Sequence, residues 1–599
     1  MAIDHSMVQR ARRDQIEART WWAGCHKLIS RLCDQLDTKV QRNGRATPDQ
    51  KLAGYLEAIL SNPQFVKDSR KSWVGKEWDK KEAAMRPRFY NAVKSVVLES
   101  QKALEAAADL RKPHLHYPLA RIMKRKIIYH AGPTNSGKTY TAIERLKQAG
   151  PEGGLFCGPL RLLALEIYET LNTAGIYCNL YTGQDKREVP FATHTSCTIE
   201  MASMQREFDV AVIDEIQMVG NKQRGAAWTK ALLGLRASEI HVCGGVEAVG
   251  LVRRLVTEAG DDFSVVTYER KTPLHASDTS LKGNYSAVQP GDCIVAFNKP
   301  DIFAIKKEIE TSTKHRCCVV YGQLPSETRS YQAKLFNEDG SGYDILVASD
   351  AIGMGLNLNI RRIIFHTVLK RTNSTAVTQI EPTLLKQIAG RAGRLRSDWD
   401  FGEVTSYQQE DLPYIKEVLS KPLEPVQAAG IFPSVEQVEE FLEVLLEHDK
   451  MEGPYRLSSV IDRMVRISKL DKRYFMQEHD QMAVVADLLH KVHKMSLADR
   501  FEFCMAPLNT RDKGQVNVLA SFAKAVSERK PTGLNVLLPG RDRIPKNVDQ
   551  LGELCSSHNI LDLYMWLSTR FPGFVEQVSK LAAAVPLRSP LLVNLPLIA

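Results

Sequence analysis

Cysteine is sparse in this sequence. The chain has 11 cysteines among 599 residues, and no two of them form a Cys-x-x-Cys pair. Closely spaced cysteine pairs are typical of zinc sites, and dense cysteine is typical of small secreted domains held together by disulfides. Cys317 and Cys318 are adjacent, but the apolar run around them predicts a buried strand. We therefore expect reduced cysteines in an intracellular protein, without a zinc site or a disulfide framework.

Long hydrophobic runs are absent too. No stretch of about 18 uncharged apolar residues occurs, so a transmembrane helix is not expected. The apolar tail at 581–599 is interrupted by Pro586, Arg588, Pro590 and Pro596. The first 20 residues hold four arginines but also three acidic residues, whereas transit peptides are poor in acids. A targeting segment is therefore not visible, and it is either absent or already removed.

The remaining composition is that of a globular protein. Hydrophobic residues make up 44% and charged residues 25%, which excludes wholesale disorder, collagen and coiled-coil fibre. The length predicts about three to five domains. The 80 Lys and Arg exceed the 70 Asp and Glu, giving a net charge of +10. This basic excess permits a polyanionic partner without demonstrating one.

The pattern along the chain predicts four regions with an α/β centre. Residues 1–125 and 426–599 are predicted to be mainly helical, whereas 126–275 and 276–425 alternate short apolar runs with helical stretches, which indicates parallel sheets. In the C-terminal region, Ser434 and Gln437 have the spacing of a capping box. The predicted strands are 127–130, 154–157, 209–213, 240–243, 293–297, 316–321, 345–348 and 362–365.

A phosphate-binding loop is predicted directly after the strand 127–130. It matches the pattern GxxxxGK[ST] and consists of Gly132, Pro133, Thr134, Asn135, Ser136, Gly137, Lys138 and Thr139. A strand precedes the loop and an amphipathic helix follows it, as phosphate binding at a helix N-terminus requires. Lys138 is expected to reach the β and γ phosphates, and the Thr139 hydroxyl is expected to bind Mg²⁺. The alternative is an ordinary glycine turn between strand and helix.

A second element supports nucleotide binding. The apolar run 208–213 ends in Asp214-Glu215-Ile216-Gln217. The carboxyl ends of parallel strands face the ligand in such sheets. We therefore expect Asp214 to bind the metal ion together with Thr139, and Glu215 to act as the base that orients the attacking water.

With these residues in place, the chain resembles the superfamily-two helicases. The second α/β region has no phosphate loop, but QIAGRAGR at 387–394 resembles their arginine motif, and VASDAIGMGLN at 347–357 resembles their motif V. The resemblance implies that Arg391 and Arg394 are arginine fingers worth about 10³–10⁵ in rate. It further implies an ATP site between two RecA-like domains, with one wall from 132–139 and 214–217. The other wall is formed by Asp350, Gly353, Gly355, Gln387, Arg391 and Arg394.

The similarity is closer to one family, the mitochondrial degradosome RNA helicases. It rests on CGPLRLLA at 157–164, SCTIEM at 196–201, AAWTKALLGL at 226–235 and RRIIF at 361–365, among others, and covers roughly 120–580. The segment 367–386 is hard to align. The resemblance implies two tandem RecA-like parallel-sheet domains flanked by helical domains, ATP and Mg²⁺ as cofactors, and 3′-to-5′ unwinding of RNA and often DNA. It also implies a mitochondrial matrix setting, with the nucleus as a second location, and an exoribonuclease partner. The nucleic-acid contacts that it implies are Pro159, Arg161, Thr198, Glu200, Gly322 and Ser349.

Two alternatives stay open at this point. The chain could be a translocase or helicase that acts mainly on DNA, because the motifs do not separate the two nucleic acids. It could also be an RNA-binding scaffold with a structural nucleotide site. The intact Lys138, Glu215 and arginine pair favour an enzyme over a scaffold.

Overall fold

The structure, a computed structural model, divides the chain into two compact units. It describes residues 99–322, 324–353, 355–372, 376–393, 401–449, 455–530 and 548–574, together with residues 23, 27, 64, 67, 68 and 80. One unit comprises residues 1–111 and 433–470, and the other comprises 112–432 and 471–599. Of the helical region predicted over 1–125, residues 1–98 lie almost entirely outside the described residues, and Arg394 lies outside them too.

The first unit is helical where it is described. It contains a helix over 99–107, α14 (Val435–Asp449) and α15 (Leu457–Ile467). The predicted capping box is confirmed, because the backbone N–H of Ser434 donates to the Gln437 side chain at 2.9 Å and the N–H of Gln437 donates to the Ser434 hydroxyl at 3.4 Å. Val438, Phe441 and Leu445 then form the buried face of α14.

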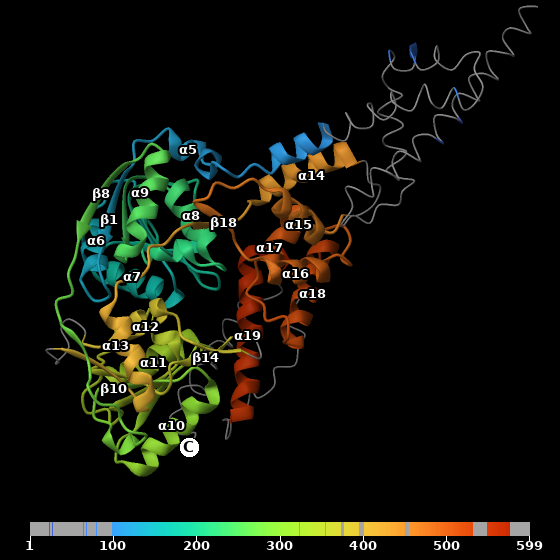
Figure 1. Ribbon diagram of the computed structural model, residues 1–599. Coiled ribbons are helices and arrows are strands. Elements are labelled where there is room, and N and C mark those ends of the chain that lie inside the picture. The colour runs from blue at the N-terminus through green and yellow to red at the C-terminus, as the bar shows by residue number, and fades with distance from the viewer. Residues whose placement is uncertain are drawn as a thin grey trace, which may run out of the picture. The chain divides into compact units, whose positions relative to one another are not determined.

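The second unit contains an eight-stranded sheet of order β4-β3-β5-β2-β6-β7-β1-β8. All its pairs are parallel except β3 with β4. Its strands are β1 (Lys126–Ala131), β2 (Gly154–Gly158), β3 (Cys178–Tyr181), β4 (Lys186–Arg187), β5 (His194–Thr198), β6 (Glu207–Ile213), β7 (Arg236–Gly244) and β8 (Asp262–Thr267). Around this sheet lie α6 (Lys138–Lys147), α7 (Arg161–Thr173), α8 (Gly225–Gly234) and α9 (Val249–Glu258) (Figure 1).

A second, six-stranded sheet follows with the order β11-β12-β10-β13-β16-β9. Its strands are β9 (Leu274–Ala276), β10 (Asp292–Val295), β11 (Cys317–Val320), β12 (Ile345–Ala348), β13 (Arg362–Phe365) and β16 (Gly402–Ser406). The accompanying helices are α10 (Lys299–Ser312), α11 (Ser326–Asn337), α12 (Pro382–Ala389) and α13 (Leu412–Ser420). Every sheet strand predicted from the sequence is confirmed, because strands buried on both faces carry continuous apolar runs.

Both faces of the second sheet are covered. Alternate strand residues fall into two apolar clusters, one with α11, α12 and α13 and the other with α10 and α19 (Val548–Arg570). The strand residues Cys317 and Cys318 point to opposite clusters, and both are buried. A helix from the C-terminal region is therefore part of the core of the second α/β domain.

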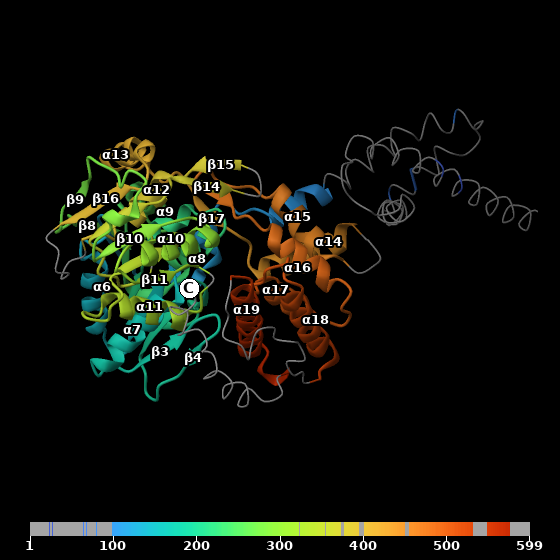
Figure 2. The same ribbon diagram turned by 90° about the horizontal axis from the view of Figure 1, so that it is seen from below.

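The remaining elements are short or C-terminal. The antiparallel pair β14 (Leu369–Thr372) and β15 (Ala376–Gln379) lies in the segment that is hard to align (Figure 2). The C-terminal helices are α16 (Asp480–Leu489), α17 (Leu497–Cys504), α18 (Lys513–Glu528) and α19. Further short elements are α5 (Pro118–Arg121), β17 (Ala429–Ile431), β18 (Tyr474–Met476) and the 3₁₀ turns η3 (Ile216–Gly220) and η6 (Asp350–Gly353). None of the described helices combines the length and the apolar character that crossing a bilayer requires.

Candidate functional site

The phosphate loop joins β1 to α6. Gly137, which caps α6, has a φ of +88°, and Asn135 has a φ of +64°, so two loop residues adopt the left-handed conformation. The Lys138 ammonium donates to the carbonyl of Pro133 at 2.9 Å and is buried. The Ser136 hydroxyl is also buried, and among the described residues it has no hydrogen-bond partner. The loop thus offers a cation and an unsatisfied hydroxyl to a phosphate group.

Asp214 lies at the carboxyl end of β6 and meets this loop. The Thr139 hydroxyl donates to its carboxylate at 3.1 Å. The indole N–H of Trp228, which is fully buried on α8, donates to the Asp214 carbonyl at 2.9 Å and fixes the backbone there. Burial, with the neighbouring charge of Glu215, raises the pKa of Asp214 to about 7. A hydroxyl and a carboxylate at this spacing are the oxygen ligands that Mg²⁺ prefers.

Glu215 is held in an uncommon backbone conformation. Its φ is +53°, which is left-handed and costly for a residue with a side chain. The Gln217 side-chain N–H donates to the Glu215 carboxylate, and the Gln217 side-chain oxygen accepts from the backbone N–H of Gly245 at 3.4 Å. These contacts join Glu215 to the end of β7 through the Gln217 side chain.

The residues predicted on the opposite wall contact other groups of their own domain. The Arg391 guanidinium donates to the Gly353 carbonyl at 2.7 Å and to the Leu356 carbonyl at 3.3 Å. Asp350 pairs with Lys370 of β14 at 2.6 Å. The finger role of Arg391 stays a prediction, since its guanidinium is bound to the motif V backbone here.

Two glycines of motif V contact side chains elsewhere: Gly353 lies beside Gln387, and Gly355 lies beside Leu160. A Cβ on Gly353 would lie 3.7 Å from the Gln387 side-chain oxygen. A Cβ on Gly355, where φ is +71°, would lie 2.6 Å from the Leu160 side chain of the first α/β domain. Only glycine therefore allows the two domains to approach at position 355.

The phosphate loop and the arginine-motif turn touch directly. A Cβ on Gly390 would lie 2.8 Å from Cβ of Thr134, so a side chain at position 390 would collide with the loop. The Asn135 side chain donates to the Gly393 carbonyl at 2.8 Å. The structure therefore brings together the two motifs that the sequence predicts on opposite walls.

The residues predicted to contact nucleic acid also gather at strand ends. Gly158 and Thr198 are paired in register at the ends of β2 and β5. Arg224 joins the two loops, because it donates to the Pro159 carbonyl at 2.9 Å and to the Glu200 carboxylate at 2.7 Å. Glu200 is thus neutralised by Arg224 and is a poor phosphate ligand by itself.

On the second domain, Gly322 and Ser349 follow the neighbouring strands β11 and β12. Val320 and Ala348 are in register, and the backbone N–H of Ser349 donates to Val320 at 2.8 Å. A Cβ on Gly322 would meet no atom within 4 Å, so open space lies in front of it. The Ser349 hydroxyl accepts from the backbone N–H of Ala351 at 3.1 Å.

Comparison with known proteins decides the family. Residues 113–268 match the family described as the DEXQ-box helicase domain of Suv3, and residues 279–396 match the helicase conserved C-terminal domain. Residues 484–527 match the Suv3 C-terminal domain 1, and residues 551–585 match the ATP-dependent RNA helicase SUV3 C-terminal domain. The mitochondrial DExH-box ATP-dependent RNA helicase DExH16 of Arabidopsis thaliana is 44% identical over 77% of this chain and 79% of its own length. The chain belongs to the Suv3 family of helicases.

Other Suv3-family relatives are longer. The mitochondrial DExH-box ATP-dependent RNA helicase DExH18 of A. thaliana is 45% identical over 81% of this chain, and the chain spans 61% of its length. Among solved structures, the DEAH/RHA helicase HrpB of Escherichia coli is similar with a TM-score of 0.42 at 12% identity, covering 73% of this chain and 58% of HrpB. The chain thus spans about three-fifths of the length of DExH18.

Arg270 is a site residue that the motifs did not indicate. It lies in the linker between the two sheets, and its guanidinium donates to the carbonyls of Gly390 at 2.9 Å, Ala392, and Thr134 at 3.4 Å. Burial lowers the pKa of Arg270 to about 10. One linker arginine thus joins the phosphate loop to the arginine-motif turn of this Suv3-family chain. No local pattern marks it, because its partner Gly390 is 120 residues away.

Glu247 is a second such residue. It follows the end of β7, beside the Glu215–Gln217 corner, and burial together with the charge of Glu215 raises its pKa. A strand that ends in Gly244-Gly245 next to the Asp214 strand is the signal that could have indicated it, because adjacent parallel strands end at one edge.

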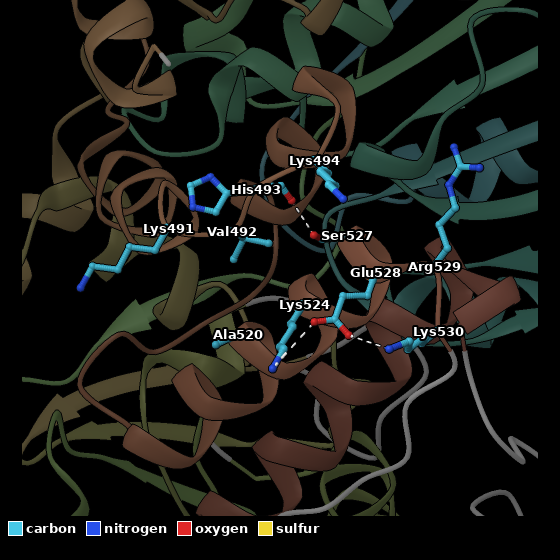
Figure 3. A pocket seen from close by; sticks show the side chains of 10 residues that line it. All are labelled: Lys491, Val492, His493, Lys494, Ala520, Lys524, Ser527, Glu528, Arg529 and Lys530. Atoms are coloured by element: carbon cyan, nitrogen blue, oxygen red, sulfur yellow. Dashed lines mark hydrogen bonds and ion pairs between the residues drawn. The ribbon is translucent and has the colours of Figure 1, made fainter. Parts of the chain in front are cut away.

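A basic groove lies on the C-terminal helices, apart from these motifs (Figure 3). Its cationic residues are Lys491, Lys494, Lys524, Arg529 and Lys530. Glu528 pairs with Lys524 at 3.8 Å and with Lys530 at 3.5 Å. These cations lie at or beyond the C-terminal ends of α16 and α18, where positive charge compensates the exposed carbonyls. Helix stabilisation accounts for the groove without a ligand.

Proposed function

We propose that the chain is an ATP-dependent RNA helicase that unwinds duplexes by moving along one strand in the 3′-to-5′ direction. The observation that carries this proposal is the 3.1 Å contact between the Thr139 hydroxyl and the Asp214 carboxylate, beside a phosphate loop whose Ser136 hydroxyl lacks a described partner. A phosphate loop combined with an arginine motif across the cleft supports nucleotide hydrolysis. The Suv3-family relatives, which are named ATP-dependent RNA helicases, support RNA as the polymer.

The residues fit MgATP. Lys138, Ser136 and the loop N–H groups would bind the phosphates, and Gly132 to Thr139 would form the cradle. Thr139 and Asp214 would hold Mg²⁺, which neutralises charge on the β and γ phosphate oxygens. Metal binding would hold Asp214 ionised, even though burial favours its protonated form.

The hydrolytic roles divide between the two domains. Glu215, with its carboxylate fixed by Gln217, would orient the attacking water and accept its proton. Arg391 and Arg394 would stabilise the charge that develops on the transferring phosphoryl group. Arg391 donates to the carbonyls of Gly353 and Leu356 in this structure. To act as a finger, it would have to exchange these carbonyls for phosphate oxygens of ATP.

RNA would cross both domains at the carboxyl ends of β2 and β5 in the first and of β11 and β12 in the second. Pro159, Arg161, Thr198 and Glu200 with its partner Arg224 would form the contact surface of the first domain. Gly322 and Ser349 would form that of the second. Backbone groups and hydroxyls of this kind contact phosphates and sugars without reading bases.

The setting and the domain division belong to the same proposal. We assign 1–125 and 426–599 to helical flanks and 126–275 and 276–425 to the RecA-like domains. A mitochondrial setting follows from the names of the relatives. The resemblance to the degradosome helicases supports an exoribonuclease that degrades the released strand as a partner, with the nucleus as a second location.

A duplex-unwinding assay tests the helicase and separates it from the alternatives. Matched RNA and DNA duplexes with a single-stranded tail on either the 3′ or the 5′ side are incubated with MgATP. We expect ATP-dependent unwinding of the 3′-tailed RNA duplex. Preference for DNA would favour the translocase, and binding without unwinding or hydrolysis would favour the scaffold.

A further inference from the structure

Helix α19 contacts both RecA-like domains. Its first half packs on the second sheet, where Leu551, Leu554 and Cys555 are buried in the same cluster as α10. Its last turns lie on the first domain: the Arg570 guanidinium donates to the Gly183 carbonyl at 3.2 Å, and a Cβ on Gly183 would lie 3.1 Å from the Trp566 ring. The helix is thus anchored at both ends, which fixes the position of its middle.

The middle of α19 presents Asp562 to Arg161. The two side chains are 3.5 Å apart, and Asp562 is also 3.4 Å from the His558 imidazole. Arg161 is the first residue of α7 and the only arginine among the predicted nucleic-acid contacts. Its other guanidinium nitrogen donates to the Gln184 side chain. An arginine expected to bind phosphate is therefore already bound to a carboxylate.

The charge of Asp562 also acts on a second arginine, Arg329. Arg329 of α11 belongs to the second RecA-like domain, and its pKa is lowered by burial and by the charge of Arg161, whereas Glu327 and Asp562 act in the opposite direction. Its buried Nε has no hydrogen-bond partner among the residues that the structure describes. Arg161 and Arg329 belong to different domains and repel each other, and the charge of Asp562 reduces this repulsion.

We propose that Asp562 is a built-in competitor of RNA: its carboxylate occupies the place on Arg161 that an RNA phosphate takes. This inference rests on the proposed function. A phosphate and a carboxylate carry the same sign of charge, so only one of them can lie beside the Arg161 nitrogen that is 3.5 Å from Asp562. RNA binding must displace Asp562 from Arg161, which breaks one of the contacts between α19 and the first domain.

The alternative is an ordinary ion pair that only holds α19 in place. The two explanations predict opposite results when the carboxylate is neutralised at constant shape. Without its competitor, and with the repulsion between Arg161 and Arg329 uncompensated, RNA should bind more tightly to Asp562→Asn. Loss of a purely structural pair should leave RNA affinity unchanged or weaken it.

Fluorescence-anisotropy titration of a labelled, unstructured single-stranded RNA tests the inference on the full chain. We expect Asp562→Asn to bind about 2- to 5-fold more tightly than wild type, the size of a partly exposed ion pair. The matched control is Glu553→Gln, which removes a carboxylate from an exposed position of the same helix and should not change affinity. In an Arg161→Ala background the gain should disappear, because the double-mutant cycle removes the shared partner.

The outcomes are distinct. Wild-type affinity in Asp562→Asn, or a gain that persists without Arg161, would overturn the inference while leaving the helicase intact. Thermal unfolding of each variant identifies loss through misfolding, which would lower affinity and therefore also count against the inference. If neither wild type nor variant binds RNA, the proposed function fails, and this inference fails with it.

Discussion

The two RecA-like domains prepare their share of the nucleotide site to different degrees. In the first, the predicted groups already contact each other: Thr139 meets Asp214 at 3.1 Å, and Gln217 holds Glu215. In the second, the predicted groups are engaged elsewhere, since Arg391 binds the Gly353 carbonyl at 2.7 Å and Asp350 binds Lys370 at 2.6 Å.

This difference teaches how binding and hydrolysis can be separated in one cleft. A preorganised first domain can hold nucleotide by itself, whereas stabilising the transition state requires groups of the second domain to change partners. Under the proposed function, hydrolysis would then be coupled to movement between the domains.

The largest effect is expected at the preorganised domain. Lys138→Ala and Glu215→Gln should each lower RNA-stimulated ATP hydrolysis by about 10⁴-fold, because one removes the phosphate cation and the other the base. Lys147→Ala, on the same helix as Lys138, is the control and should retain activity. Circular dichroism should show an intact fold, and substantial hydrolysis by Glu215→Gln would remove Glu215 from the mechanism.

Arg391 tests the second domain. Arg391→Ala should lower kcat by about 10³-fold while nucleotide binding is retained, because the arginine acts on the transition state more than on the ground state. Parallel measurements of ATP turnover and of fluorescent-nucleotide affinity check this. If affinity fell in step with turnover, the contrast between the two domains would be wrong.

Arg270 should have an intermediate effect. Arg270→Ala frees the turn that carries Arg391, so kcat should fall about 10- to 100-fold with little change in KM for ATP. Arg270→Lys keeps the charge but cannot reach the same three carbonyls, and it should restore little. Full rescue by lysine would mean that charge alone matters and that the turn is positioned by other contacts.

RNA binding should depend strongly on salt and little on sequence. For a single strand, log K should fall with log salt at a slope of about −0.7 for each phosphate neutralised. Arg161→Ala should weaken all unstructured RNAs alike and make the slope shallower by about 0.7. Arg254→Ala, exposed on α9, serves as the control. A flat salt dependence, or strong preference for one sequence, would reveal base recognition.

The smallest effect concerns the stability of the first domain in acid. His130 on β1 lies 2.8 Å from the Tyr268 hydroxyl and 2.7 Å from His241, and burial followed by the charge of His241 lowers its pKa from 6.5 to about 4. The unfolded chain then binds the proton more readily, so stability should be lost as the pH falls from about 6.5 through about 4. His130→Gln should flatten the dependence of Tm on pH over this window. The exposed His275→Gln should not, and equal profiles for all three proteins would contradict the assignment.

The central fold could be predicted from the sequence because its strands are buried on both faces. Such strands carry apolar runs that are visible locally, as in 345–348. The hairpin β14–β15 was not predicted, because Leu369, Arg371 and residues 377–379 are exposed, so the side chains described there show no alternation of buried and exposed positions. The role of α19 was also missed, since a helix pattern does not say which sheet the helix covers.

The sequence could predict those parts of the candidate site whose residues lie close together in one motif. The phosphate loop and the Asp214 strand end are continuous motifs, so the sequence alone could predict that Thr139 and Asp214 lie together. Arg270, Glu247 and Arg224 act through partners that are distant in sequence, and each is an ordinary charged residue without its fold. The engagement of Arg161 by Asp562 likewise depends on how α19 crosses the domains, which no local pattern contains.

The most direct test of the account is steady-state ATP turnover with and without single-stranded RNA. We expect RNA to raise kcat of the wild-type chain by about 10-fold or more, because the second domain must change partners before hydrolysis proceeds. Glu215→Gln should show neither basal nor stimulated turnover. Turnover that is the same with and without RNA, or nucleotide binding with no hydrolysis under either condition, would contradict an RNA-coupled motor.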